Sequence, residues 1–246
     1  MFPICHIYFA DKIIGKLSQF NILGSIYPDI VISDVLSRES THYNTLQLYD
    51  YFKYMDIKMR DFAMGTITHG VDMKGLDYYS DENYPDMDSG YCFEKGKQIE
   101  KDVINCCKIP EKWGLWKAHN FIEMAFEICV YRQNKWLKES LKNALEDIEV
   151  IKYVSKNLQL FLNINEGMLV DKFKRFTDFI EYKDINENTM MKKYCIQLEV
   201  KYGIKDVNNL CGAKIIAKAI ELIQGDVDDF FDFTVAKVTG VLNNLE

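Results

Sequence analysis

The sequence predicts an all-α protein, and three features support that prediction. The chain of 246 residues has only four prolines and 13 glycines, which is few for a β-rich chain that needs a turn about every ten residues. Apolar side chains instead recur with the period of amphipathic helices along most of the chain. Hydrophobic residues make up 48% of the sequence, enough to bury a large core. We therefore expect a multi-helix bundle.

The charge and the cysteines limit the class of protein. A net charge of −7 and a pI near 5.3 provide no basic field for a nucleic-acid polymer, and a polyanionic substrate would need a metal to offset this charge. The seven cysteines contain no CxxC pair, which favours a reduced protein. No apolar run approaches the length of a membrane span, and no signal peptide is evident. We expect a cytoplasmic protein and leave its oligomeric state open.

The first two segments each carry one candidate functional residue. The pattern from His6 to Phe20 predicts an amphipathic helix with His6 in its first turn. From residue 21 to residue 32 a glycine and Pro28 predict a bent segment, which places Asp29 at a turn or at the start of a short helix. An aspartate there is most simply a helix cap.

The next two predicted helices place further histidines. A helix that begins near Ser40 and Thr41 has His42 in its first turn, where the helix dipole keeps a histidine neutral and able to bind a metal. The following helix carries His69, and residues three and eight positions later lie along the same helix face. Asp72 and Asp77 occupy those positions, so this face can hold a metal ion. The alternative is a surface helix with two solvated aspartates.

A long segment and one strong helix follow. Residues 78–91 are acidic and rich in tyrosine, and they predict a loop that forms either a substrate rim or a plain surface excursion. A short helix is expected over residues 99–107, and a longer one from Glu111 to Arg132. In the longer helix His119 and Glu123 are one turn apart, which suits either two ligands of one ion or an ordinary surface pair.

The rest of the chain predicts helices without further histidines. Residues 1–132 are expected to form a metal-site helical core, and residues 133–246 a C-terminal helical layer packed on the same domain. The five predicted helices of this layer cover residues 136–162, 167–182, 186–202, 208–223 and 226–242. We find no repeat and no glycine-rich phosphate loop, so the chemistry is expected in the first half.

The order of these elements resembles the zinc-dependent phospholipase C family, whose all-α fold is shared with single-strand-specific nucleases. Residues 24–29 (GSIYPD) match the family's Gly-x-x-x-Pro-Asp segment, and residues 62–69 (FAMGTITH) match the run into its central helix. Residues 119–123 (HNFIE) match its closing HxxxE pair, and His6 and His42 match two earlier histidines. The resemblance covers about half of the chain and implies a phospholipase C-like bundle with additional C-terminal helices.

The resemblance implies a metal-dependent phosphoesterase that uses two or three zinc ions to activate water. The family has an acid at +4 and a histidine at +8 from the central histidine, where this chain has aspartates at +3 and +8. Because aspartate at +8 gives the site more oxygen ligands, iron and manganese are alternatives to zinc. The substrate would be a small phosphoester or a phospholipid, and Asp29 would also be the catalytic base. The implied metal ligands are His6, Asp29, His42, His69, Asp72, Asp77, His119 and Glu123.

Two other functions remain open. An HD-type phosphohydrolase also combines histidines with aspartates on helices, but it needs a contiguous His-Asp pair, and none of the four histidines is followed by aspartate. A non-catalytic helical binding or scaffold protein with a degenerate metal site fits the altered spacing after His69.

Overall fold

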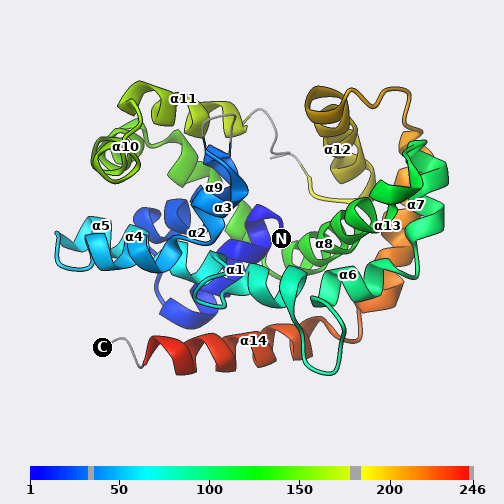
Figure 1. The fold of residues 1–246 in the computed structure, drawn as a ribbon, viewed down its shortest axis with the longest axis horizontal. Coiled ribbons are helices and arrows are strands. Elements are labelled where there is room, and N and C mark those ends of the chain that lie inside the picture. The colour runs from blue at the N-terminus through cyan, green and yellow to red at the C-terminus, as the bar shows by residue number, and fades with distance from the viewer. Residues whose placement is uncertain (33–35, 178–183, 244–246) are drawn as a thin grey trace. The chain divides into compact units, whose positions relative to one another are not determined.

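The computed structural model describes residues 1–32, 36–177 and 184–243, and within these residues every regular element is helical (Figure 1). This confirms the predicted all-α class. The α-helices are α1 (Pro3–Ile14), α2 (Gln19–Val31), α3 (Arg38–His42), α4 (Thr45–Phe52), α5 (Ile57–His69), α6 (Tyr91–Gly96), α7 (Glu100–Cys107), α8 (Gly114–Gln133), α9 (Trp136–Glu146), α10 (Ile148–Leu162), α11 (Glu166–Phe176), α12 (Glu187–Tyr202), α13 (Asn209–Ile223) and α14 (Val227–Leu242). A π-helical turn (Tyr78–Glu82) and a 3₁₀ turn (Glu111–Trp113) complete the set.

The chain forms two compact units, each assembled from segments that are distant in the sequence. Of the described residues, unit 1 contains 1–2, 79–134 and 184–230, and unit 2 contains 3–78, 135–177 and 231–243. The proposed division into residues 1–132 and 133–246 stays a prediction. The two units share the four histidines of the chain. His6, His42 and His69 belong to unit 2, and His119 belongs to unit 1.

Helices α2 and α5 form the centre of unit 2, with α1, α4 and α9 packed against one or both of them. The two helices cross at glycines. A Cβ added to Gly24 would lie 2.0 Å from the carbonyl oxygen of Phe62, and one added to Gly65 would lie 2.1 Å from that of Asn21. Because no side chain separates the two backbones at this crossing, their spacing is set by main-chain atoms.

Helix α8 is the centre of unit 1, where α6, α7, α12 and α13 contact it. Its residues Phe121, Ile122, Ala125 and Phe126 are buried. The rings of Tyr91 and Phe230 lie 5.5 Å and 5.0 Å from that of Phe126, in the edge-on or tilted arrangements that aromatic rings prefer. This packing holds the face of α8 that carries His119 and Glu123.

Several predicted helix boundaries are wrong. The helix predicted over residues 136–162 is two helices, α9 and α10, and a π-helical turn begins the loop predicted over residues 78–91. Three further corrections concern predicted site residues. Helix α2 continues through Pro28, so Asp29 lies inside the helix and not at a turn or at the start of a new one. A proline in a helix interior costs about 3 kcal/mol, and the burial of ten of the 13 residues of α2 offsets that cost. His42 ends the short helix α3 instead of beginning a longer one. Helix α5 ends at His69, so neither Asp72 nor Asp77 lies on it.

Candidate metal centres

Five predicted site residues meet in unit 2, and we call them the histidine–aspartate centre: His6, Asp29, His42, His69 and Asp77. Each comes from a different segment, namely α1, α2, α3, α5 and the chain that follows α5. The Nε2 atoms of His42 and His69 lie 3.3 and 4.0 Å from Asp29 Oδ1. They lie 3.4 and 3.3 Å from Asp77 Oδ2. His6 Nε2 lies 3.5 Å from the other Asp77 oxygen, and its ring stacks on that of His69.

The backbone around the centre determines which ring nitrogens face inward. His69 Nδ1 lies 2.7 Å from the carbonyl oxygen of Ser25, which only accepts, so Nδ1 carries the proton. His42 Nδ1 lies 2.8 Å from Thr41 Oγ1, whose own hydroxyl proton is directed to backbone carbonyls. In the neutral rings both Nε2 atoms therefore present lone pairs, and these two atoms are 3.2 Å apart. Such an arrangement needs a proton or a metal ion between the rings.

The charges of the centre suit a cation. Burial and the neighbouring His69 hold the pKa of His6 well below its usual value, so His6 is in the neutral form that binds metals. Burial alone would raise the pKa of Asp29, but a hydrogen bond to His42 and the charges of His69 and His42 hold it below the usual value. The pKa of Asp77 is also well below its usual value despite burial, and His69, His6 and His42 are among the groups that lower it. Burial also opposes charge on His42, yet hydrogen bonds to Asp29 and Asp77 raise its pKa to about 9. Without a metal, a proton on His42 therefore balances part of the negative charge.

The residues of the centre fit a metal ion. Two groups of ligand atoms, one from His6, Asp29 and His69 and the other from His42, His69 and Asp77, each lie within 4.8 Å of one another. Ligands bound at about 2.1 Å in a tetrahedral site are about 3.4 Å apart, which matches the separations of 3.2 to 4.0 Å found here. Imidazole and carboxylate together are the ligand set of zinc, iron and manganese sites.

Asp77 reaches the centre because the chain turns back sharply after α5. The carbonyl oxygen of His42 accepts from Val71 N at 2.7 Å, and that of Gly70 accepts from Gly75 N at 2.8 Å. A Cβ on Gly75 would lie 2.7 Å from three carbonyl oxygens at the end of α5 and in this turn. The turn therefore needs glycine at position 75, and it returns the buried Asp77 to the end of α5.

Asp72 does not join the centre among the described groups. Its carboxylate accepts from Thr45 Oγ1 and, at 2.8 Å, from the backbone N–H of Leu46. Asn44, the residue that precedes α4, makes no side-chain cap of its own. Asp72 thus supplies the cap of α4 from a distant position in the sequence, a role that satisfies an otherwise unpaired helical N–H group.

Unit 1 holds a second group that could bind a metal, formed by Asp81, His119 and Glu123, which we call the Asp81 group. Its atoms already have partners in the protein. Glu123 Oε1 lies 2.8 Å from the α-amino group of Met1. The side-chain amide of Asn120 donates to His119 Nε2 at 2.9 Å and to Glu123 Oε2 at 3.3 Å. Asn120 is itself held by the hydroxyl of Tyr194.

Sequence reasoning missed two residues beside these groups. Asp81 lies in the acidic, tyrosine-rich segment, where no spacing distinguishes it from its neighbours. Arg38 lies beside the histidine–aspartate centre, with Nη2 3.8 Å from Asp77 Oδ2 and 38% of its side chain exposed. The only signal for Arg38 was its position four residues before His42, one helical turn away.

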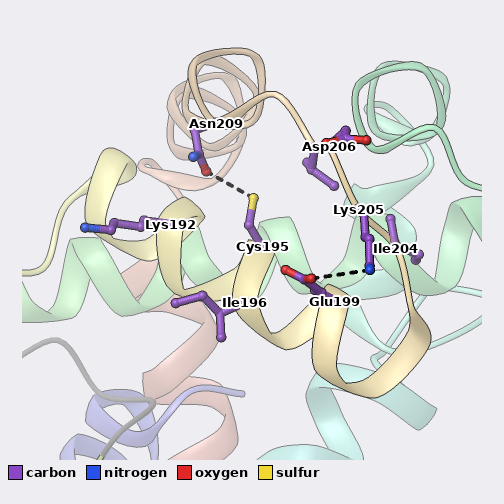
Figure 2. A pocket seen from close by; sticks show the side chains of 9 residues that line it. Lys192, Cys195, Ile196, Glu199, Ile204, Lys205, Asp206 and Asn209 are labelled. Carbon is purple, nitrogen blue, oxygen red and sulfur yellow. Dashed lines mark hydrogen bonds and ion pairs between the residues drawn. The ribbon is translucent and has the colours of Figure 1, made fainter.

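A pocket of about 210 Å³ lies between α12 and α13 of unit 1 (Figure 2). Figure 2 shows two interactions among its lining residues, a hydrogen bond from Cys195 to Asn209 and an ion pair between Glu199 and Lys205. None of the predicted site residues lines it.

Comparison of the chain with known families, with curated proteins and with solved structures gives no match. Among the described residues, no helix combines the length and the apolar character that crossing a bilayer requires.

Proposed function

We propose that this chain is a metal-dependent phosphoesterase of the phospholipase C-like kind, with its metal held by the histidine–aspartate centre. The observation that supports this most strongly is the pair of Nε2 atoms of His42 and His69, which face each other at 3.2 Å between two carboxylates. Zinc is the metal we propose first, with manganese and iron as alternatives because two of the five ligands are aspartates.

Each residue of the centre has a distinct task in this proposal. His6, His42, His69 and Asp77 are almost fully buried and would hold the metal. Asp29 has 34% of its side chain exposed, so it is the member that water and substrate reach most easily. When bound, the metal would supply a Lewis acid that binds a phosphate oxygen and makes a water molecule more acidic. Asp29 would orient the attacking water or complete the ligand set.

Arg38 gives the centre a means to recognise a phosphoester. Its guanidinium lies beside Asp77 and is partly exposed, so it can turn toward a bound phosphate without leaving the carboxylate unpaired. Guanidinium groups bind phosphate oxygens through paired hydrogen bonds. In a chain of net charge −7, this local positive charge favours a small phosphoester or a phospholipid head group over a bare cation substrate.

The test combines metal content with turnover. Protein purified without chelators should contain zinc, manganese or iron by elemental mass spectrometry and should hydrolyse bis-nitrophenyl phosphate. Asp77→Asn should lose metal and turnover, whereas Asp72→Asn, which alters the cap of α4, should keep both. Absence of all three metals in the wild-type protein, together with no turnover after their addition, would exclude the proposal.

A second candidate is a metal site that only stabilises the fold of a binding or scaffold protein. It is favoured by the burial of four of the five residues of the centre. In that case removal of the metal would lower the melting temperature strongly, and the metal-loaded protein would still not hydrolyse any phosphodiester. Turnover that returns with the metal rejects this candidate.

A further inference from the structure

Four of the seven cysteines gather in unit 1, and none of the four is among the predicted metal ligands. Cys106 and Cys107 end α7, Cys195 lies on α12, and Cys211 lies in the first turn of α13. Cys106 lies close enough to Cys211 and Cys107, and Cys107 close enough to Cys195 and Cys211, for these thiols to affect one another's pKa. The sequence alone shows no CxxC pair and does not indicate this grouping.

One residue holds the first pair in position. Asn208 caps α13, with its side-chain oxygen accepting from the backbone N–H of Cys211 at 3.0 Å. Its carbonyl oxygen accepts from the thiol of Cys106 at 3.7 Å. Because α7 and α13 also pack directly on each other, these contacts bring Cys106 beside the first turn of α13, which carries Cys211.

The other two thiols are placed less favourably for reaction with Cys211. Cys195 donates to Asn209 at 3.0 Å and lines the pocket between α12 and α13 (Figure 2). Cys107 is fully buried. Successive residues of a helix point about 100° apart, so Cys106 and Cys107 approach Cys211 from different directions, and only Cys106 contacts the residue that caps α13. Among the described residues, none of these thiols belongs to a group of three or more ligand atoms close enough for a metal ion.

We propose that Cys106 and Cys211 are an oxidation site that forms a disulfide between α7 and α13 when the protein meets a small disulfide such as oxidised glutathione. Cys211 is half-buried and Cys106 is buried, so the reagent reaches Cys211 first. Burial raises the pKa of Cys106, and it raises that of Cys107 to about 12, which leaves both thiols protonated and slow to start the reaction.

The reaction has two balanced steps. The sulfur of Cys211 attacks the small disulfide, whose S–S bond breaks, and one half leaves as a thiol with the proton of Cys211. The sulfur of Cys106 then attacks the sulfur of Cys211 and displaces the second half, which takes the proton of Cys106. Two protein thiols are oxidised to one disulfide, and one small disulfide is reduced to two thiols.

The experiment treats the full chain with oxidised glutathione, blocks the remaining thiols by alkylation, and maps disulfides by tryptic digestion under non-reducing conditions. Trypsin would release residues 102–108, which contain both Cys106 and Cys107, and residues 206–214, which contain only Cys211. We expect these two peptides to be joined. The link should persist in Cys107→Ser and disappear in Cys106→Ser and in Cys211→Ser, while Cys129→Ser on α8 should behave as the wild type.

The outcomes separate the proposal from its alternatives. A link that survives Cys106→Ser, or that involves residues 194–201 with Cys195, would assign the chemistry to another pair and overturn the proposal. Separately modified Cys106 and Cys211 in the wild type would also overturn it. If Cys106→Ser does not fold, a link that persists in Cys107→Ser and disappears in Cys211→Ser makes the same assignment. The link closes a loop of about 100 residues, so the oxidised protein should melt at a higher temperature than the reduced one.

Discussion

The histidine–aspartate centre of unit 2 and the Asp81 group of unit 1 use similar residues but satisfy them differently. In the Asp81 group, Asn120 and the α-amino group of Met1 already contact Glu123, and Asn120 also contacts His119. In the centre, backbone and hydroxyl groups occupy the outer nitrogens of His42 and His69 and leave their inner nitrogens facing each other. A histidine or carboxylate can bind a metal readily when its protein hydrogen bonds are made by the atoms that face away from the site, and less readily when the ligand atoms themselves are hydrogen-bonded.

The largest expected effect comes from removing the residue shared by both ligand sets of the centre. Altering a partner of a metal ligand typically costs about 10- to 100-fold in metal affinity, so His69→Ala should cost more than about 100-fold and remove turnover of bis-nitrophenyl phosphate. His119→Ala should leave the affinity of the centre within about tenfold of the wild type. Calorimetric zinc titration measures both, and equal losses in the two variants would show that the comparison between the groups is mistaken.

The second largest effect is expected in the pH dependence of metal binding to the histidine–aspartate centre. The pKa of His42 is raised from 6.5 to about 9, so its proton stabilises the metal-free folded protein fully below pH 6.5 and less as pH rises to 9. A metal must displace this proton. Zinc affinity should therefore rise about tenfold per pH unit between pH 7 and 9 and then level off.

The control for this pH dependence is His42→Ala, which should bind zinc more weakly and without that slope. Titrations in weakly coordinating buffers at several pH values would provide the measurement. An affinity that is flat from pH 7 to 9 in the wild type would mean that no proton is displaced from the centre.

Substitution of Arg38 should weaken substrate binding and leave the metal content unchanged. Loss of its guanidinium in Arg38→Gln should raise KM about tenfold, equivalent to about 1.4 kcal/mol, because a partly exposed charged contact to phosphate is lost. Metal content per chain should equal that of the wild type. Steady-state kinetics beside elemental analysis tests this, and loss of metal from the variant would assign Arg38 a structural role at Asp77 instead.

The smallest effect is expected at Asp72. Asp72→Ala removes the cap of α4 and should lower the free energy of unfolding by about 1 kcal/mol. Metal content and turnover should stay within about twofold of the wild type, a change of less than 0.5 kcal/mol. Denaturant unfolding and the phosphodiester assay measure the two properties separately. If the variant has the free energy of unfolding of the wild type but has lost its metal, Asp72 is a metal ligand and the prediction is wrong.

The helical class and most of the clustered residues were predictable from the sequence, because helical periodicity and residue type are local properties. His119 and Glu123 were placed correctly on one helix for the same reason. The choice between Asp72 and Asp77 was not predictable, since it depends on α5 ending at His69 and on the tight turn at Gly75. Asp81 had no local signal either, because only the packing of unit 1 brings it to α8.

The crossing of α2 and α5 at Gly24 and Gly65 has a consequence for the size of ion that the centre accepts. Asp29 lies on α2 and His69 on α5, and the main chains of these helices are already in contact. Calcium takes six to eight oxygen ligands at about 2.3 to 2.6 Å, so admitting it would require the helices to slide apart. In the metal site that we propose, the fixed spacing of this helix pair would therefore favour small ions of low coordination number over calcium.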